Sequence, residues 1–271
     1  MKIGISSWSY PWAIGVAGKM PPTPMGARAL VEKAAELKAD VVQFSDNLPL
    51  HALDRAQLAS LNKDAQDAGI LVEVGTRGVQ PNNLHTYIGI AAELCSPILR
   101  TLLHDAGGAP RIPEARRRIE AVLPELEASR IVLAIENHDF YTTEELASLI
   151  ADINSPYVKV CLDPVNNYGL GESLKEVLRA LSEYTVNFHC KDYVISRKPS
   201  QLGFDVVGAP TGTGMLDMAL CRKSLPDGLS YVVELWTPWQ GEIEKTMAME
   251  DDWAHRSMRF LHEFKEAQTN G

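Results

Sequence analysis

Short apolar runs alternate with longer amphipathic segments along the whole chain. Between the runs, apolar residues recur at three- and four-residue spacing, as in Leu146, Leu149, Ile150 and Ile153, which is typical of amphipathic helices. The Thr142–Glu145 segment ahead of that helix resembles an N-cap followed by first-turn acids. The predicted strands are Lys2–Trp8, Val41–Asp46, Leu71–Thr76, Ile98–Asp105, Ile131–Asn137, Val158–Pro164, Val186–Asp192 and Tyr231–Trp236.

Strand and helix units in series, with strands that are apolar on both faces, predict a parallel sheet covered by helices. Eight such units are the number that closes into a (β/α)8 TIM barrel. The alternative is an open, doubly wound sheet, whose usual mark is a Gly-rich phosphate loop after the first strand. That position holds Ser6–Tyr10 without a GxGxxG motif. No composition break divides the chain, so we expect one barrel domain over residues 1–271.

Composition narrows the class of protein. The 271 residues are 45% apolar and carry 26 Lys and Arg against 35 Asp and Glu, which gives a formal charge of −9. This composition excludes wholesale disorder and argues against nucleic acid or an anionic membrane as a partner. No apolar run reaches the roughly 18 residues of a membrane span. The four cysteines form no CxxC pair, and Cys161 and Cys190 lie in apolar strand-like runs, so we expect these two thiols to be buried and reduced and the location to be cytoplasmic.

Polar residues close the last four predicted strands: Glu136, Asp163, His189 and Glu234. Any one of them could cap a helix or solvate the barrel mouth. Adjacent barrel strands lie about 4.8 Å apart, so the four side chains should converge. Three carboxylates this close would repel one another without a cation. The pattern therefore predicts a divalent metal site, with Mn²⁺ first among Mn²⁺, Mg²⁺ and Co²⁺, and with Zn²⁺ also possible.

These residues give the chain its resemblance to the xylose-isomerase-like TIM barrel superfamily, with its sugar phosphate isomerases and epimerases. The resemblance covers essentially the whole chain. The family's metal ligands, Glu, Asp, His and Glu at the ends of strands five to eight, match Glu136, Asp163, His189 and Glu234. HCKDY, from His189 to Tyr193, is similar to the family's seventh-strand motif. GAPTGTGMLD, from Gly208 to Asp217, is similar to its Gly-rich loop before the seventh helix.

The resemblance implies a metal-dependent isomerase or epimerase acting on a sugar or sugar-like keto compound. Glu136 and Glu234 would bind the metal and also move protons on opposite faces of the substrate. The metal would chelate a carbonyl and its neighbouring hydroxyl and stabilise the enediolate. The implied partner is a small carbohydrate, and a homo-oligomer is possible.

One position departs from the family's epimerases, which commonly carry a His three residues after the sixth-strand Asp. Asn166 stands there, and its amide can hydrogen-bond a hydroxyl but cannot titrate. Arg197, in the long connection Tyr193–Gly214, could clamp a carboxylate. Arg77, Arg100 and His104 near other strand ends could make the pocket cationic. Together these features keep open a lyase, a decarboxylase or dehydratase of a keto sugar acid. The candidate substrate-binding residues are Trp8, His104, His138, Asn166, Lys191 and Arg197.

Two further interpretations have less support. An enzyme like endonuclease IV would need more metal ligands, mostly His, and a basic groove for DNA. A barrel that has lost catalysis would not be expected to keep all four ligands.

Overall fold

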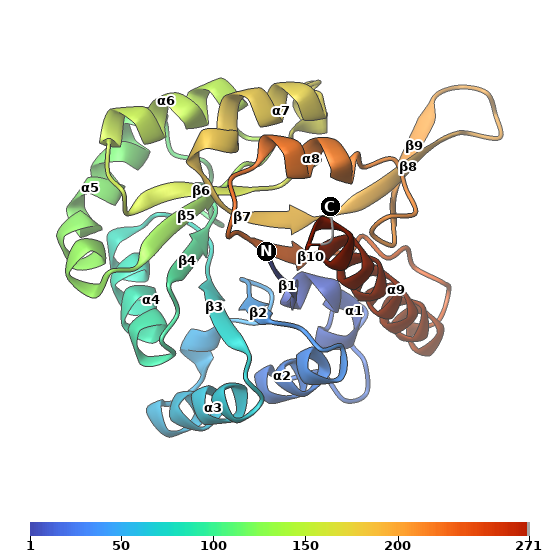
Figure 1. Ribbon diagram of the computed structural model, residues 1–271, viewed down its shortest axis with the longest axis horizontal. Coiled ribbons are helices and arrows are strands. Elements are labelled where there is room, and N and C mark those ends of the chain that lie inside the picture. Colours follow the sequence, from blue (N-terminus) through green and yellow to red (C-terminus); the bar gives the residue numbers. More distant parts are fainter. Residues whose placement is uncertain (270–271) are drawn as a thin grey trace.

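The computed structural model describes residues 1–269, and its centre is a closed barrel of parallel strands (Figure 1). The strands follow one another around the barrel in the order β1-β10-β7-β6-β5-β4-β3-β2, so the predicted (β/α)8 barrel is confirmed. The barrel strands are β1 (Lys2–Ser6), β2 (Val41–Phe44), β3 (Leu71–Gly75), β4 (Ile98–Thr101), β5 (Val132–Glu136), β6 (Val158–Leu162), β7 (Thr185–Cys190) and β10 (Ser230–Val233).

Helices cover the outside of the barrel (Figure 1). The α-helices are α1 (Pro11–Ile14), α2 (Ala27–Glu36), α3 (Arg55–Asp67), α4 (Pro81–Glu93), α5 (Ile112–Ser129), α6 (Thr143–Ile153), α7 (Leu174–Leu181), α8 (Met218–Ser224) and α9 (Ile243–Thr269). The 3₁₀ turns are η1 (Ser7–Ser9), η2 (Leu50–Ala52), η3 (Asn166–Leu170) and η4 (Ser182–Tyr184). Thr142 caps α6 in a reciprocal capping box with Glu145, as its sequence predicts. Within residues 1–269, none of the helices combines the length and apolar character needed to cross a bilayer.

On β4, β5 and β6 the inward-facing residues change from apolar to polar toward the carboxyl ends of the strands. Ile98, Ala134 and Cys161 form a small apolar cluster there, separate from the large core between strands and helices. Alternate residues of a strand face the same side, so the residues two positions further continue this inward face. These are Arg100, Glu136 and Asp163. The carboxyl ends of the strands therefore present buried charge where barrel enzymes place their active sites.

The long connection after β7 differs from the expected irregular loop. It forms an antiparallel hairpin of β8 (Asp192–Arg197) and β9 (Phe204–Ala209), which projects away from the barrel (Figure 1). The apolar and polar residues of this stretch do not alternate cleanly, and the wall of the barrel contributes no partner strand. This is why helix and strand periodicity did not reveal the hairpin.

Asp192 anchors the base of this hairpin. Its side chain accepts hydrogen bonds from the backbone N–H groups of Gly212, Gly214 and Leu216 at 2.8 to 2.9 Å. A Cβ on Gly214 would lie 2.3 Å from the Asp192 Oδ1, so this close approach requires glycine. The HCKDY motif and the Gly-rich loop identified in the sequence are thus in direct contact, through the Asp192 side chain.

Candidate metal and substrate site

The four predicted metal ligands come together at the carboxyl ends of the strands. Glu136 ends β5, Asp163 follows β6, His189 lies in β7 and Glu234 follows β10. One donor atom from each lies within 4.8 Å of the others, and all four residues are buried. Strand pairing brings these positions side by side, as their spacing in the sequence predicts.

His189 is oriented by a hydrogen-bonded network inside the barrel. Its Nε2 lies 2.9 Å from Oε1 of Gln43. The Gln43 Nε2 donates to a Glu73 carboxylate oxygen at 3.0 Å and to the Asn187 Oδ1 at 3.2 Å. Because the amide nitrogen is committed to these acceptors, the Gln43 oxygen must face the ring, and the His189 Nε2 carries the proton.

The other ring nitrogen of His189 faces the carboxylates. The Nδ1 has no hydrogen-bond partner among the described residues. It lies 3.4 Å from the Glu234 Oε1, 3.6 Å from the Glu136 Oε2 and 3.8 Å from the Asp163 Oδ2. A buried imidazole nitrogen aimed at three carboxylates, with its opposite N–H held by a polar partner, is the arrangement of a metal-ligating histidine. The residues present therefore fit a divalent cation.

Cys161 lies beside this site, with its Sγ 3.2 Å from the His189 Nε2. Burial raises the pKa of the Cys161 thiol to about 11. The thiol contacts the Nε2 of the ring, whereas the Nδ1 is the ring nitrogen that faces the three carboxylates. The available donors are thus oxygens and one nitrogen, which suit Mn²⁺, Mg²⁺ or Co²⁺.

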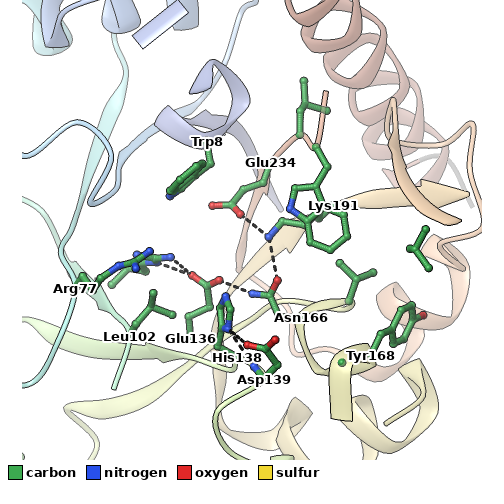
Figure 2. Close-up of a pocket in the computed structure, with 16 residues that line it drawn as sticks. Trp8, Arg77, Leu102, Glu136, His138, Asp139, Asn166, Tyr168, Lys191 and Glu234 are labelled. Carbon is green, nitrogen blue, oxygen red and sulfur yellow. Dashed lines mark hydrogen bonds and ion pairs between the residues drawn. The ribbon is translucent and has the colours of Figure 1, made fainter. Parts of the chain in front are cut away.

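The positive charge of Lys191 compensates the negative charges of two of the carboxylates. Its Nζ lies 2.6 Å from the Asp163 Oδ2 and 2.9 Å from the Glu234 Oε2. It also donates to the Asn166 Oδ1 at 3.2 Å (Figure 2). Burial alone would lower the pKa of Lys191, but the carboxylates of Asp163 and Glu234 outweigh it and raise the pKa above its usual range. Burial alone would raise the pKa of Asp163, but Lys191 and His189 hold it well below its usual range.

Arg100 and Asn166 together hold both oxygens of Glu136. The Arg100 Nε lies 2.5 Å from the Glu136 Oε2, and the Arg100 Nη2 forms an ion pair with the same oxygen. The Asn166 Nδ2 donates to the Glu136 Oε1 at 2.8 Å. Arg100 also reaches the Asp46 Oδ1 at 3.0 Å and the Thr76 carbonyl at 3.2 Å. Glu136 is therefore fixed in place and charge-compensated.

The site opens into a cavity of about 520 Å³. Four of the predicted substrate-binding residues line it with the two glutamates. These six residues are Trp8, Glu136, His138, Asn166, Lys191 and Glu234 (Figure 2). Trp236 closes one side, with the Lys191 Nζ 5.2 Å from the centre of its ring.

The structure does not bring His104 or Arg197 into the cavity lining. His104 is buried behind His138 and Phe140, with ring centres 5.1 and 4.1 Å apart. Burial, with the nearby His138, lowers the pKa of His104 to about 4, so the ring is neutral. Arg197 ends β8 on the projecting hairpin, with its guanidinium carbon 4.4 Å from the centre of the Phe204 ring. Arg197 was expected in a loop, but the structure places it at the end of a hairpin strand and outside the cavity lining.

Sequence reasoning missed how Gln43, Glu73 and Asn187 work together. All three are fully buried inside the barrel. Their sequence signal is a polar residue in the middle of an apolar strand, as in VVQFSD and LVEVGT. That signal marks a buried polar group, but only the fold shows that the three residues meet.

Comparison with known proteins identifies related sequences and folds. A family model described as a xylose isomerase-like TIM barrel matches residues 31–264. A 3-oxo-isoapionate decarboxylase from Pectobacterium atrosepticum is 34% identical over 265 residues, which cover 97% of this chain and 95% of that protein.

Two solved structures share the fold at low sequence identity. A xylose isomerase domain protein from Planctomyces limnophilus is 18% identical, with a TM-score of 0.72 over 89% of this chain and 94% of that one. A D-psicose 3-epimerase from Clostridium cellulolyticum H10 is 16% identical, with a TM-score of 0.73 over 97% and 99%.

Proposed function

The chain belongs to the xylose isomerase-like TIM barrel family, and we propose that it is a metal-dependent decarboxylase of a 3-oxo sugar acid. Of the two hypotheses that the sequence left open, the proposal selects the lyase and not the isomerase. The relative that is 34% identical over nearly the full length is named for such a reaction. The structural neighbours with epimerase names are under 20% identical and support the fold alone.

The main support for the proposal is that both carboxylate oxygens of Glu136 are held by neighbouring side chains. An epimerase of this type needs two carboxylates free to remove and return a proton on opposite faces of one carbon. Both oxygens of Glu136 are already bonded, one to Arg100 and the other to Asn166. Neither oxygen can take a substrate proton without giving up its contact with the Arg100 guanidinium or with the Asn166 amide. A decarboxylation needs no base, because the bond that breaks is a carbon–carbon bond.

The charges of the site also fit an anionic substrate. The ion-pair network of the site, whose two parts are connected by the His189 Nδ1, contains four carboxylates and three permanent cations. A divalent ion added to this network leaves one positive charge in excess. A substrate with one carboxylate neutralises that excess, whereas a neutral sugar does not. The network runs through Asp46, Arg77, Arg100, Glu136, Asp163, Lys191 and Glu234.

The protein groups have defined tasks in this reaction. Glu136, Asp163, His189 and Glu234 would hold the metal, which supplies a Lewis acid for the substrate's keto oxygen. Lys191 places a permanent positive charge at the cavity wall, where it stabilises negative charge that develops on substrate oxygen as carbon dioxide leaves. Asn166 lies between Glu136 and Lys191 and can orient a hydroxyl. Trp8 and Trp236 supply apolar walls that limit water in the cavity.

The electron balance is closed without a further reactant. The pair of the broken carbon–carbon bond moves into the keto group, carbon dioxide leaves, and the carbon takes one proton that water ultimately supplies. The product is a neutral ketose with one carbon fewer.

A dual assay in deuterated water tests the proposal. The protein is loaded with Mn²⁺ and incubated with 3-oxo-isoapionate, D-fructose or D-psicose, while carbon dioxide and deuterium in the recovered sugars are followed together. We expect carbon dioxide from the keto acid, one deuterium in its product, and no deuterium in the two ketoses. Deuterium exchange or interconversion of the ketoses without carbon dioxide release would support the isomerase instead.

A further inference from the structure

Arg77 lies at the mouth of the cavity, two residues after the end of β3. Its side chain is 41% exposed, in contrast to the 3% of Arg100. Its Nε pairs with the Asp46 Oδ2 at 2.8 Å. Figure 2 shows Arg77 on the Glu136 side of the cavity, across from Lys191.

Asp46 is a rigid support for Arg77. Its other carboxylate oxygen, Oδ1, lies 3.0 Å from the Arg100 Nη1 and accepts a hydrogen bond from the Trp8 indole at 3.4 Å. Burial alone would raise the pKa of Asp46, but Arg100 and Arg77 outweigh it and lower the pKa, so the carboxylate stays ionised. The orientation of the Arg77 guanidinium is thus fixed through its Nε.

The two arginines of the cavity use their donors differently. Arg100 directs its Nε, Nη1 and Nη2 at protein oxygens. Arg77 commits only its Nε, and its two terminal nitrogens have no protein partner within residues 1–269. An oriented guanidinium with a free pair of N–H donors facing a cavity matches the two oxygens of a carboxylate.

We infer that the free edge of Arg77 is the binding site for the substrate's carboxylate. This rests on the proposed function for the identity of the substrate, but the binding site itself can be tested without turnover. The position suits a leaving group, because carbon dioxide would form at the exposed mouth of the cavity. Lys191, whose side chain is 6% exposed, lies deeper and across the cavity from Arg77, where the keto oxygen would bind.

The partial exposure of Arg77 determines its kinetic effect. A leaving carboxylate loses its charge as carbon dioxide forms, so a strong buried cation would hold the substrate more tightly than the transition state. A half-exposed guanidinium interacts more weakly because solvent screens it. We therefore expect Arg77 to act mainly on substrate binding, with KM raised in its variants and kcat changed much less.

Binding of two matched, unreactive probes tests the inference. Threonate and threitol share a four-carbon polyol frame, but only threonate carries a carboxylate. Their affinities for the Mg²⁺-loaded protein are measured by calorimetry in the wild type and in the variants Arg77→Met and Arg77→Lys. Arg179→Met is the matched control, because Arg179 is an exposed arginine of α7 outside the cavity.

The wild type should prefer threonate, and Arg77→Met should reduce that preference roughly 10- to 100-fold through threonate alone. Arg77→Lys should retain part of it, and Arg179→Met all of it. An unchanged preference in Arg77→Met, or no preference in the wild type, would overturn the inference. If the preference survives in Arg77→Met but disappears when the metal is removed, the carboxylate binds the metal. Failure of the proposed function would appear separately, as absence of carbon dioxide release by the wild type.

Discussion

The Nε2 of His189 lies 2.9 Å from the side-chain oxygen of Gln43, and this contact aims the opposite ring nitrogen at three carboxylates. Glu73 and Asn187 hold the Gln43 amide in the orientation that makes this possible. The geometry that suits the site to a metal ion thus depends on residues that do not line the cavity.

Replacing Gln43 should therefore weaken metal binding. Gln43→Met keeps the volume of the side chain but removes the acceptor for the His189 N–H. Loss of such a partner typically costs roughly 10- to 100-fold in metal affinity. Titration calorimetry with Mn²⁺ measures the metal affinity of each variant. Glu73→Gln is the conservative control, because its amide oxygen can still accept from Gln43. An affinity that is equal in Gln43→Met and wild type would show that the orientation of His189 does not need this contact.

Freeing Glu136 should change the chemistry of the site. In Arg100→Lys the positive charge remains, but the paired contacts of the guanidinium Nε and Nη2 with the Glu136 Oε2 are lost. We expect carbon dioxide release to fall and slow deuterium exchange into D-fructose to appear, because Glu136 regains access to a substrate C–H bond. NMR of the recovered sugar detects the exchange, and thermal unfolding checks that the variant is folded. A folded variant without any exchange would mean that the Arg100 contact is not what suppresses proton abstraction.

Glu234→Gln should leave the fold intact and reduce turnover by at least about 100-fold, because the amide keeps the size of the side chain but removes a charged metal ligand. The matched control is Glu242→Gln, since Glu242 is an exposed residue paired with Lys245. The ratio kcat/KM measures the effect, and near-normal turnover in Glu234→Gln would exclude Glu234 from the metal site.

His104 should make the protein sensitive to acid. Its pKa is lowered to about 4 in the folded chain, mainly by burial, against about 6.5 when unfolded. Its contribution is therefore fully present above pH 6.5 and is lost as the pH falls toward 4. Over this range the wild type should lose up to about 3 kcal/mol more stability than His104→Phe, which cannot take up the proton. Urea unfolding at pH 7 and pH 4.5 measures the difference, and parallel losses in both proteins would refute the assignment.

The barrel and the positions of its polar strand ends could be predicted from the sequence. Glu136, Asp163, His189 and Glu234 each close an apolar run, and the regular repeat of strands dictates that such residues converge. Residues two apart share a face of a strand, so His138 and Lys191 can also be expected near the mouth from the positions of Glu136 and His189.

Other features depend on contacts that no local pattern encodes. Arg197 was expected in a loop over the site, but its segment pairs with itself as a hairpin and carries the side chain away. The contact between Arg100 and Glu136 joins two residues that are 36 positions apart in the chain. In the proposed function, the contacts that hold Glu136 favour decarboxylation over proton transfer, and these contacts form only in the packed barrel.

The most direct test of metal-dependent decarboxylation uses 3-oxo-isoapionate labelled with ¹³C in its carboxylate. We expect labelled carbon dioxide to appear in step with a neutral ketose, to stop when a chelator removes the metal, and to resume when Mn²⁺ is restored. A metal-loaded protein that leaves the labelled carboxylate intact while exchanging protons on neutral ketoses would contradict it.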